Sequence, residues 1–373
     1  MSLKKILIIL IVLLAIIISA LVIYNFFIKK DAEPIIEPDT SQTTPTTAPN
    51  QSQIKAISQE SVMSPIIDNG KVKYYLTING NVFESNFDGS ESTRLSSNNL
   101  TGLLDILWSP SKTKVIALFE ENELLKKYLY DNETQQSTEF DANIRYTNWS
   151  PIQDKIAYQY YNAETGDNNI SIANSDGSQW TDVFSTRMKN LIVEWPNSGK
   201  ITLRTKPSGL AQSVIYAIDL ASGDFKKILD ETYGLTVLWS PLGNKLLFSE
   251  TDERGKNLKL KITDLDESIT NGLNFVTLPE KCVWSQDNRT VFCAIPKNIS
   301  DLATFPDDYY KTIISFSDDF WRINLDTGEK NRIFQAQGAE ENAYDAKNLL
   351  LSADEDYLLF INKKDGLLYS LPL

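Results

Sequence analysis

The sequence contains no histidine and only two cysteines among its 373 residues. Without histidine the chain cannot build a Ser-His-Asp or Cys-His catalytic group, a histidine-ligated metal site or a histidine pH switch. Two cysteines cannot form a zinc site by themselves. We therefore expect no bound metal and no cofactor, and any catalysis would have to rely on carboxylates.

Basic residues are also scarce relative to acidic ones. The chain has 36 Lys and Arg against 49 Asp and Glu, which gives a formal net charge of −13. Residues 1–30 contain four lysines and no acid, so the remainder is more acidic still. A surface of this sign repels phosphate backbones, and we expect no nucleic-acid partner.

The amino end carries a long apolar run. Residues 6–28 contain no charge and consist almost entirely of Leu, Ile, Val, Ala and Phe. A helix of this length spans roughly 35 Å, against about 30 Å for the hydrocarbon core of a bilayer. We predict an uncleaved signal-anchor transmembrane helix within residues 1–30, with the amino end cytoplasmic and the rest of the chain extracytoplasmic. The alternative is a signal peptide cleaved after Ala20, although the apolar run continues past that site.

Residues 31–51 are rich in Pro and Thr and poor in large apolar side chains. Such a composition buries too little surface to compensate for the entropy of ordering. We predict a disordered, flexible linker here.

The strongest signal is an internal repeat of about 44 residues across residues 52–373. Each copy has a Trp, or another apolar residue, before a polar turn and an apolar strand. The repeat anchors are Met63, Trp108, Trp149, Trp195, Trp239, Trp284 and Leu351. A second strand pair follows in each copy, and four strands per unit is the size of one propeller blade. We predict an all-β, seven-bladed β-propeller of four-stranded blades. A β-sandwich would share the local signals but not a repeat of whole four-strand units.

The repeated phrase itself resembles a known family. Trp108-Ser109-Pro110 is followed by a polar turn and a strand, and other strands end in Asp-x-x-x-Gly, as at 219–223. This pattern resembles the WD40-like repeat of TolB-type β-propellers, which also occurs in the propellers of prolyl-oligopeptidase-like enzymes. The resemblance covers roughly residues 60–373 and implies the fold. The resemblance does not extend to the amino-terminal domain of TolB or to the hydrolase domain of the peptidases, so their activities are not implied. Propeller lyases with this repeat use histidines to bind metal.

The ends of the repeat array predict how the ring closes. The last unit runs out after its third strand, and residues 53–58 form an isolated strand before the first unit. An open ring would expose unpaired strand edges. We predict that residues 52–59 supply the outermost strand of the last blade; the alternative is that they belong to the linker.

The two cysteines flank one hairpin turn. Cys282 and Cys293 lie at equal distances from the turn between Asp287 and Asn288, so they would face each other across antiparallel strands. A disulfide and a pair of buried free thiols both fit this placement.

Two groups of residues are candidates for binding. The first lies at strand starts that line the central channel of a propeller: Asp105, Arg145, Glu194 and Lys281. The second lies in an insertion over residues 297–317, between the second and third strands of the sixth unit: Phe305, Asp307, Asp308, Tyr309 and Tyr310. The channel residues could bind a polar ligand or only solvate the channel. Exposed aromatics beside acids would suit a protein or glycan contact, and an insertion without function is the alternative. The repeated Trp residues are interpreted as core rather than as a ligand surface.

These observations predict a cell-membrane protein with a single span and a monomeric, extracytoplasmic propeller. It would bind a protein or a cell-wall glycan without catalysing a reaction. The alternative is a histidine-independent glycosidase or lyase at the channel mouth. That enzyme would need two carboxylates about 5–9.5 Å apart.

Overall fold

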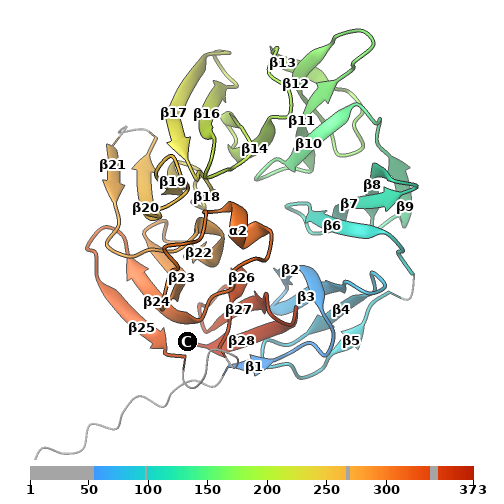
Figure 1. The fold of residues 1–373 in the computed structure, drawn as a ribbon. Helices are drawn as coiled ribbons and strands as arrows, with labels where there is room; N and C mark the ends of the chain where they lie inside the picture. The colour runs from blue at the N-terminus through green and yellow to red at the C-terminus, as the bar shows by residue number, and fades with distance from the viewer. Residues whose placement is uncertain (1–53, 97–98, 266–268, 337–342) are drawn as a thin grey trace, which may run out of the picture. The chain divides into compact units, whose positions relative to one another are not determined.

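The computed structural model describes residues 54–96, 99–265, 269–336 and 343–373. These residues form seven four-stranded antiparallel sheets arranged as the blades of a propeller (Figure 1). The predicted all-β, seven-bladed fold is therefore confirmed. The predicted transmembrane helix and linker, residues 1–30 and 31–51, lie outside the described residues. Within the described ranges, no helix has the length and apolar character needed to span a bilayer.

The blades follow the order of the chain, and each starts with its innermost strand. Blade 1 comprises β2 (Val62–Asp68), β3 (Lys71–Leu76), β4 (Val82–Ser85) and β5 (Thr93–Arg94). Blade 2 comprises β6 (Leu103–Trp108), β7 (Lys114–Glu121), β8 (Leu124–Asp131) and β9 (Gln136–Glu139). Blade 3 comprises β10 (Ile144–Trp149), β11 (Lys155–Tyr161), β12 (Asn168–Asn174) and β13 (Thr181–Ser185). Blade 4 comprises β14 (Ile192–Asn197), β15 (Lys200–Arg204), β16 (Gln212–Asp219) and β17 (Phe225–Tyr233).

The remaining three blades follow the same plan. Blade 5 comprises β18 (Val237–Trp239), β19 (Lys245–Glu250), β20 (Lys259–Asp264) and β21 (Ile269–Gly272). A short 3₁₀ helix, η2 (Pro279–Lys281), leads into blade 6, which comprises β22 (Cys282–Trp284), β23 (Thr290–Pro296), β24 (Asp318–Asn324) and β25 (Lys330–Phe334). Blade 7 comprises β26 (Ala346–Leu351), β27 (Tyr357–Asn362), β28 (Leu368–Pro372) and β1 (Lys55–Ala56).

The hydrophobic core lies between the blades. The second strands β11 and β19 are buried along most of their length, because a neighbouring blade covers each face. The fourth strands β9 and β21 are exposed throughout, because the blades diverge toward the outside of the ring. The gradient from apolar inner strands to polar outer strands therefore follows from the radial arrangement of the sheets.

The repeated Trp side chains connect neighbouring blades. Trp149 ends β10, is buried, and donates a hydrogen bond from Nε1 to the carbonyl of Leu107 in blade 2 at 2.9 Å. Trp108 ends β6 and donates to the carbonyl of Ser64 in blade 1 at the same distance. Each indole thus adds apolar area and a hydrogen bond to the contact with the preceding blade.

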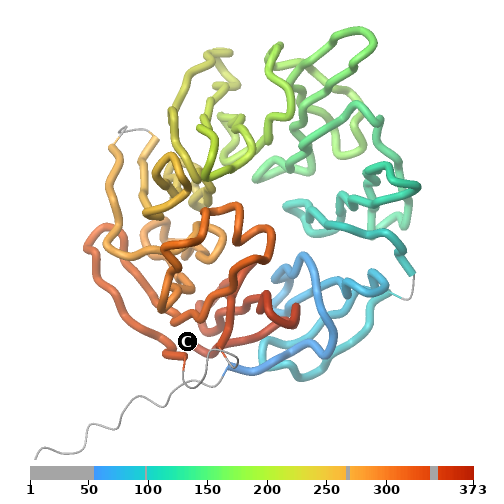
Figure 2. The backbone as a smooth tube through the Cα atoms, in the orientation of Figure 1, coloured from blue at the N-terminus to red at the C-terminus, as the bar shows by residue number. Residues whose placement is uncertain are grey.

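The two ends of the propeller meet in blade 7. Strand β1 pairs antiparallel with β28, with Lys55 opposite Ser370 and Ala56 opposite Tyr369. The hydroxyl of Ser58 accepts a hydrogen bond from the backbone N–H of Leu368 at 2.9 Å. Figure 2 shows the blue start of the described chain beside the red carboxyl-terminal strands. Residues from before the first blade therefore supply the outermost strand of the last one.

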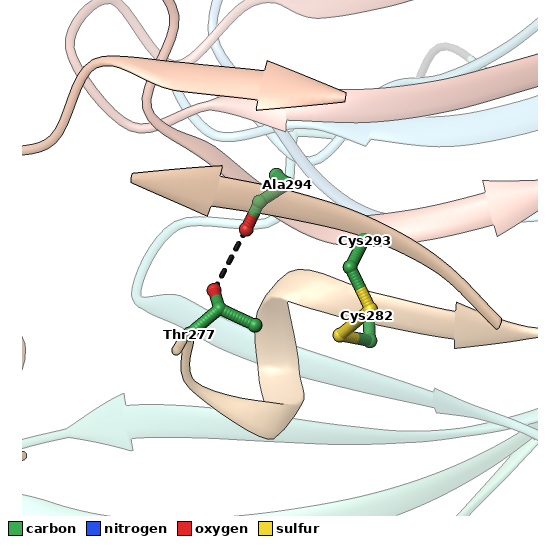
Figure 3. The surroundings of a disulfide bond; sticks show 4 residues. All are labelled: Thr277, Cys282, Cys293 and Ala294. Carbon is green, nitrogen blue, oxygen red and sulfur yellow. Dashed lines mark hydrogen bonds between the residues drawn. A yellow bond between two sulfur atoms is a disulfide. The ribbon is translucent and has the colours of Figure 1, made fainter. Parts of the chain in front are cut away.

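Cys282 and Cys293 are joined by a disulfide in blade 6 (Figure 3). They are direct partners in the β22–β23 pairing, and their Cα atoms lie 4.1 Å apart. Beside them, the hydroxyl of Thr277 donates a hydrogen bond to the carbonyl of Ala294 at 2.7 Å. The disulfide links the innermost strand of blade 6, β22, to the second strand, β23.

Candidate functional site

The insertion at residues 297–317 connects β23 to β24 and contains the short helix α2 (Asp307–Tyr310). In Figure 1, α2 is drawn within the ring, beside β22 and β26. The Asp307 carboxylate accepts a hydrogen bond from the backbone N–H of Gly209 in blade 4 at 2.6 Å. The N–H of Phe305 donates to the carbonyl of Gly255 in blade 5 at 2.8 Å. Contacts with other blades thus hold the insertion in place.

A buried ion cluster lies under the insertion. The ammonium of Lys281 lies 2.8 Å from Oδ2 of Asp318 and 2.7 Å from Oδ1 of Asp345, and all three side chains have no exposed surface. It also donates a hydrogen bond to the carbonyl of Ala346 at 2.8 Å. These contacts join the entry to β22 with β24 and with the entry to β26. Hydrogen bonds and opposite charges are what allow such groups to be buried.

Side chains from the insertion complete this cluster. The Tyr309 hydroxyl donates to Oδ1 of Asp345 at 3.3 Å, and the N–H of Phe316 donates to its Oδ2 at 3.0 Å. The Lys281 ammonium lies 5.4 Å from the centre of the Tyr309 ring and 5.1 Å from that of Phe316. On the other face of Tyr309, the ammonium of Lys363 is 3.6 Å from the ring centre. Two aromatic rings therefore cover the ion cluster.

Two carboxyl groups of this region, those of Asp318 and Glu280, have raised pKa values. Burial raises the pKa of Asp318 to about 6, even though the charge of Lys281 acts in the opposite direction. Burial also raises the pKa of Glu280, which lies in η2. Oδ1 of Asp318 and Oε1 of Glu280 have no hydrogen-bond partner among the described residues. The cluster is thus strongly desolvated.

These positions correct two expectations from the sequence. Lys281, expected in a solvated channel, is fully buried. Phe305 and Tyr309, expected as exposed aromatics of the insertion, are 2% and 3% exposed, whereas Tyr310 is 49% exposed. The insertion folds inward because its aromatic rings find apolar and charged partners there. The Asp308 carboxylate caps the turn before α2 by accepting the N–H of Thr304 at 2.7 Å.

Sequence reasoning missed the two carboxylates that pair with Lys281. Asp345 directly precedes β26, as Lys281 directly precedes β22. Asp318 is the first residue of β24. Their positions at the starts of strands were therefore a usable signal, but the fold of the insertion was needed to show that they converge.

A hollow of about 530 Å³ lies at blades 2 and 3, with lining residues that also come from the start of blade 4 and the β15–β16 loop. It is lined by Asp105, Leu107, Ile116, Leu118, Leu125, Lys127, Ala142, Arg145, Tyr146, Thr147, Asn190 and Lys206. Two of the predicted channel residues, Asp105 and Arg145, therefore share one hollow. We call this hollow the open mouth.

Three cations line the open mouth: Lys127, Arg145 and Lys206. Within the described parts of the chain, none of them lies within 4.0 Å of a carboxylate oxygen. Arg145 instead stacks on Tyr161, with its guanidinium carbon 4.9 Å from the ring centre. Lys206 lies 5.9 Å from the ring centre of Tyr146. Lys127 donates a hydrogen bond to the carbonyl of Ile144 at 2.8 Å. The contacts of Arg145 and Lys206 with aromatic faces leave their N–H donors available to an anion.

The electrostatics of the open mouth also suit an anion. Burial and the nearby charge of Arg145 lower the pKa of Lys127, so a bound anion would stabilise the charged form of its ammonium. Asp105 is the one carboxylate among the lining residues, and it accepts a hydrogen bond from the Ser64 hydroxyl at 3.0 Å.

Glu194, the fourth predicted channel residue, already has partners for both of its carboxylate oxygens. Its Oε1 pairs with Nε of Arg204 at 3.2 Å, and its Oε2 accepts a hydrogen bond from Nε1 of Trp239 at 3.2 Å. It therefore links blades 4 and 5. In the described ranges no group of three or more Cys, Asp or Glu side chains could hold a metal ion.

Comparisons with known proteins agree with the propeller fold. No protein-family model and no curated protein matches the sequence. An oligogalacturonate lyase from Vibrio parahaemolyticus is similar over 87% of this chain and 94% of its own, with a TM-score of 0.60 and 10% identity. The β-propeller domain of the trilobed protease from Pyrococcus furiosus is similar over 83% and 95%, with a TM-score of 0.55 and 13% identity. TolB from Acinetobacter baumannii is similar over 82% of this chain and 64% of its own, with a TM-score of 0.46 and 16% identity. At such identities, the two likenesses with TM-scores above 0.5 show a shared fold and nothing about activity.

Proposed function

We propose that the protein is a membrane-tethered, extracytoplasmic binding module that recognises an anionic group of a cell-envelope partner at the open mouth. One observation carries this proposal: Lys127, Arg145 and Lys206 surround a hollow without ion pairs, in a chain whose net charge is −13. An acidic protein that keeps cations free of carboxylates at one place concentrates positive potential there. Such a place attracts anions.

The state of the other carboxylates supports binding rather than catalysis. Asp318 and Asp345 are sealed under the insertion and paired with Lys281. Glu194 is held by Arg204 and Trp239. The alternative function, a glycosidase or lyase that uses two carboxylates, needs a pair that reaches substrate. These three carboxylates do not offer one.

The proposed cellular location rests on two further features. The uncharged run at residues 6–28 has the length of a membrane span. The Cys282–Cys293 disulfide is typical of proteins outside the reducing cytoplasm. A reporter fused after residue 373 should therefore be active only in an extracytoplasmic form. Activity restricted to a cytoplasmic reporter would contradict this orientation.

Binding at the open mouth can be tested by calorimetry with the full-length chain. The probes are polyglutamate, as an acidic peptide, and oligogalacturonate, as the acidic glycan named for one structural neighbour. The test variant is Lys127→Gln/Arg145→Gln/Lys206→Gln. The control, Lys226→Gln/Lys259→Gln/Arg254→Gln, removes the same charge from exposed positions elsewhere.

We expect at least one probe to bind, with an affinity that falls as salt is raised because the interaction is electrostatic. The test variant should lose at least about tenfold in affinity, which corresponds to about 1.4 kcal/mol. The control should stay within about twofold of the wild type. Equal losses in the two variants would indicate a general charge effect, and turnover of oligogalacturonate would favour the enzyme.

A further inference from the structure

A second hollow lies away from the open mouth, between blades 1 and 2. Its volume is about 850 Å³, within the range typical of small-molecule sites. Its lining comes from β2, β3 and β4 of blade 1, from β6, β7, β8 and β9 of blade 2, and from turns and loops next to these strands. We call it the inter-blade pocket. Neither the sequence repeat nor the proposed function accounts for it.

Aromatic rings form much of the wall. The pocket is lined by Tyr75, Trp108, Phe119, Tyr128 and Tyr130. The rings of Tyr75 and Trp108 have centres 5.6 Å apart, and so do those of Phe119 and Tyr128. Rings that pack on one another in this way are held rigidly. They present flat apolar surfaces to whatever fills the space.

Two phenol hydroxyls in this wall have no partner. Tyr75 is only 4% exposed, and its hydroxyl makes no hydrogen bond to any described residue. The hydroxyl of Tyr130 makes no such hydrogen bond either. Burial raises the pKa of Tyr75, and the nearby Tyr130 raises it further. Neither hydroxyl is among the sealed polar atoms without a partner, so both open onto the pocket. An occupant of the pocket can therefore bond to both hydroxyls.

The cations around the pocket are already compensated. Asp68 lies 2.6 Å from the ammonium of Lys73 and 3.9 Å from that of Lys112. Glu121 lies 3.4 Å from the ammonium of Lys126. An anionic ligand would have to compete with these pairs and would meet the carboxylate of Glu133, which lines the pocket without an ion pair among the described residues. The other polar groups at the rim are neutral amides and hydroxyls, among them Asn132, Gln135 and Ser137.

We propose that the inter-blade pocket binds a neutral saccharide. The C–H faces of sugar rings would pack on the wall around Trp108, and sugar hydroxyls would bond to the hydroxyls of Tyr75 and Tyr130. Only a ligand with both apolar faces and many neutral hydrogen-bonding groups satisfies the whole wall. An acyl chain would leave both phenols without partners, and an anionic ligand would find no free cation. This site is separate from the open mouth, so either proposal can fail alone.

The test uses the full-length chain and three neutral oligosaccharides: cellobiose, maltotriose and N,N′-diacetylchitobiose. Laurate and galacturonate serve as apolar and charged competitors. The variants Tyr75→Phe and Tyr130→Phe remove one hydroxyl each and keep the ring. The matched control, Tyr216→Phe, removes a hydroxyl in blade 4, outside the pocket. Binding is measured by calorimetry, and stability without ligand by urea unfolding.

We expect at least one oligosaccharide to bind and each pocket variant to weaken it about three- to tenfold, as for the loss of one hydrogen bond. Without sugar, Tyr75→Phe should be about as stable as the wild type, because it removes a hydroxyl that makes no hydrogen bond to any described residue. The control and the open-mouth triple variant should bind the sugar normally. Failure of all three sugars to bind, preferential binding of laurate or galacturonate, or a marked loss of stability in Tyr75→Phe would each overturn the proposal.

Discussion

The Nζ atom of Lys281 and the Oδ1 atom of Asp345, 64 residues apart in sequence, lie 2.7 Å from each other with no exposed surface on either side chain. This ion pair joins the entry of blade 6 to the entry of blade 7. Asp318 adds a second carboxylate from within blade 6. The centre of the propeller is thus held on this side by charge as well as by apolar packing.

Substitution of Lys281 by Met should strongly destabilise the protein. The methionine would leave Asp318 and Asp345 buried without a counter-charge, and breaking a buried pair costs about 3–5 kcal/mol. The measurement is the free energy of unfolding in urea at pH 7. The control is Lys226→Met on the exposed strand β17, which should change it by less than about 0.5 kcal/mol. A similarly small change for Lys281→Met would show that the cluster is not a structural requirement.

Asp318 should give the protein a pH dependence opposite to that of most carboxylates. Its folded pKa of about 6 exceeds its ordinary value of 3.8, so the folded state binds the proton more tightly. The stabilising effect of protonation is present below about pH 4 and is lost as the pH rises through 6. The full effect is about 3 kcal/mol. Asp318→Asn should remove this slope from unfolding free energies measured between pH 4 and 8.

Asp219 provides a contrast to Asp318. Backbone N–H groups of Ser222 and Ala221 donate to its carboxylate and lower its pKa. Its contribution to stability is present above the ordinary pKa and is lost on acidification. Asp219→Asn should therefore leave the slope between pH 5 and 8 unchanged. If both variants show the wild-type slope there, the pH dependence has another source.

The disulfide should contribute measurably to stability. It closes a short segment, with a sequence separation of 11 between Cys282 and Cys293. Closing a loop of this size restricts the unfolded chain by about 3 kcal/mol in the chain-entropy treatment. Reductant should lower the melting temperature of the wild type but not that of Cys282→Ala/Cys293→Ala. Two free thiols found by labelling under non-reducing conditions would contradict the bond.

The contact between the insertion and the β15–β16 loop can be tested by a substitution at Gly209. A Cβ atom at Gly209 would lie 2.2 Å from the carbonyl oxygen of Phe305, so Gly209→Ala must push the insertion away. We expect a loss of about 1–3 kcal/mol and faster proteolysis within residues 297–317. Gly272→Ala is the control, because a Cβ there meets no atom within 4 Å. Equal proteolysis of the two variants would argue against the contact.

Ring closure can be tested by deletion. Removal of residues 52–59 takes away β1 and leaves the edge of β28 unpaired, which should lower the melting temperature and promote association. The control is removal of residues 41–48 from the linker. Unchanged melting after the first deletion would show that the ring is stable without its outermost strand in blade 7.

The fold was predictable because every blade carries the same local pattern. A Trp such as Trp149, a turn and a buried strand recur at nearly constant spacing, and these signals depend only on neighbours in sequence. The limits 297 and 317 of the insertion also follow from that spacing, since β23 ends at Pro296 and β24 begins at Asp318.

The sites were only partly predictable because they depend on contacts between blades. The repeat placed Asp105 and Arg145 at strand starts, and they line the open mouth. It did not indicate Lys127 or Lys206, which reach the mouth from β8 and from a loop. Tyr75 and Tyr130 come from different blades and line the same pocket, and no sequence pattern indicates that they lie close together. The burial of Lys281 likewise depends on how the insertion folds over it, and the sequence repeat contains no information about that.

The pairing of β1 with β28 has a mechanical consequence. Strand β1 is the first described strand and follows the segment proposed to tether the propeller, so a pull transmitted through that segment would act first on the Lys55–Ser370 and Ala56–Tyr369 pairs. The same few hydrogen bonds that close the ring would thus bear the load, and tension would open blade 7 before it disturbed any other blade.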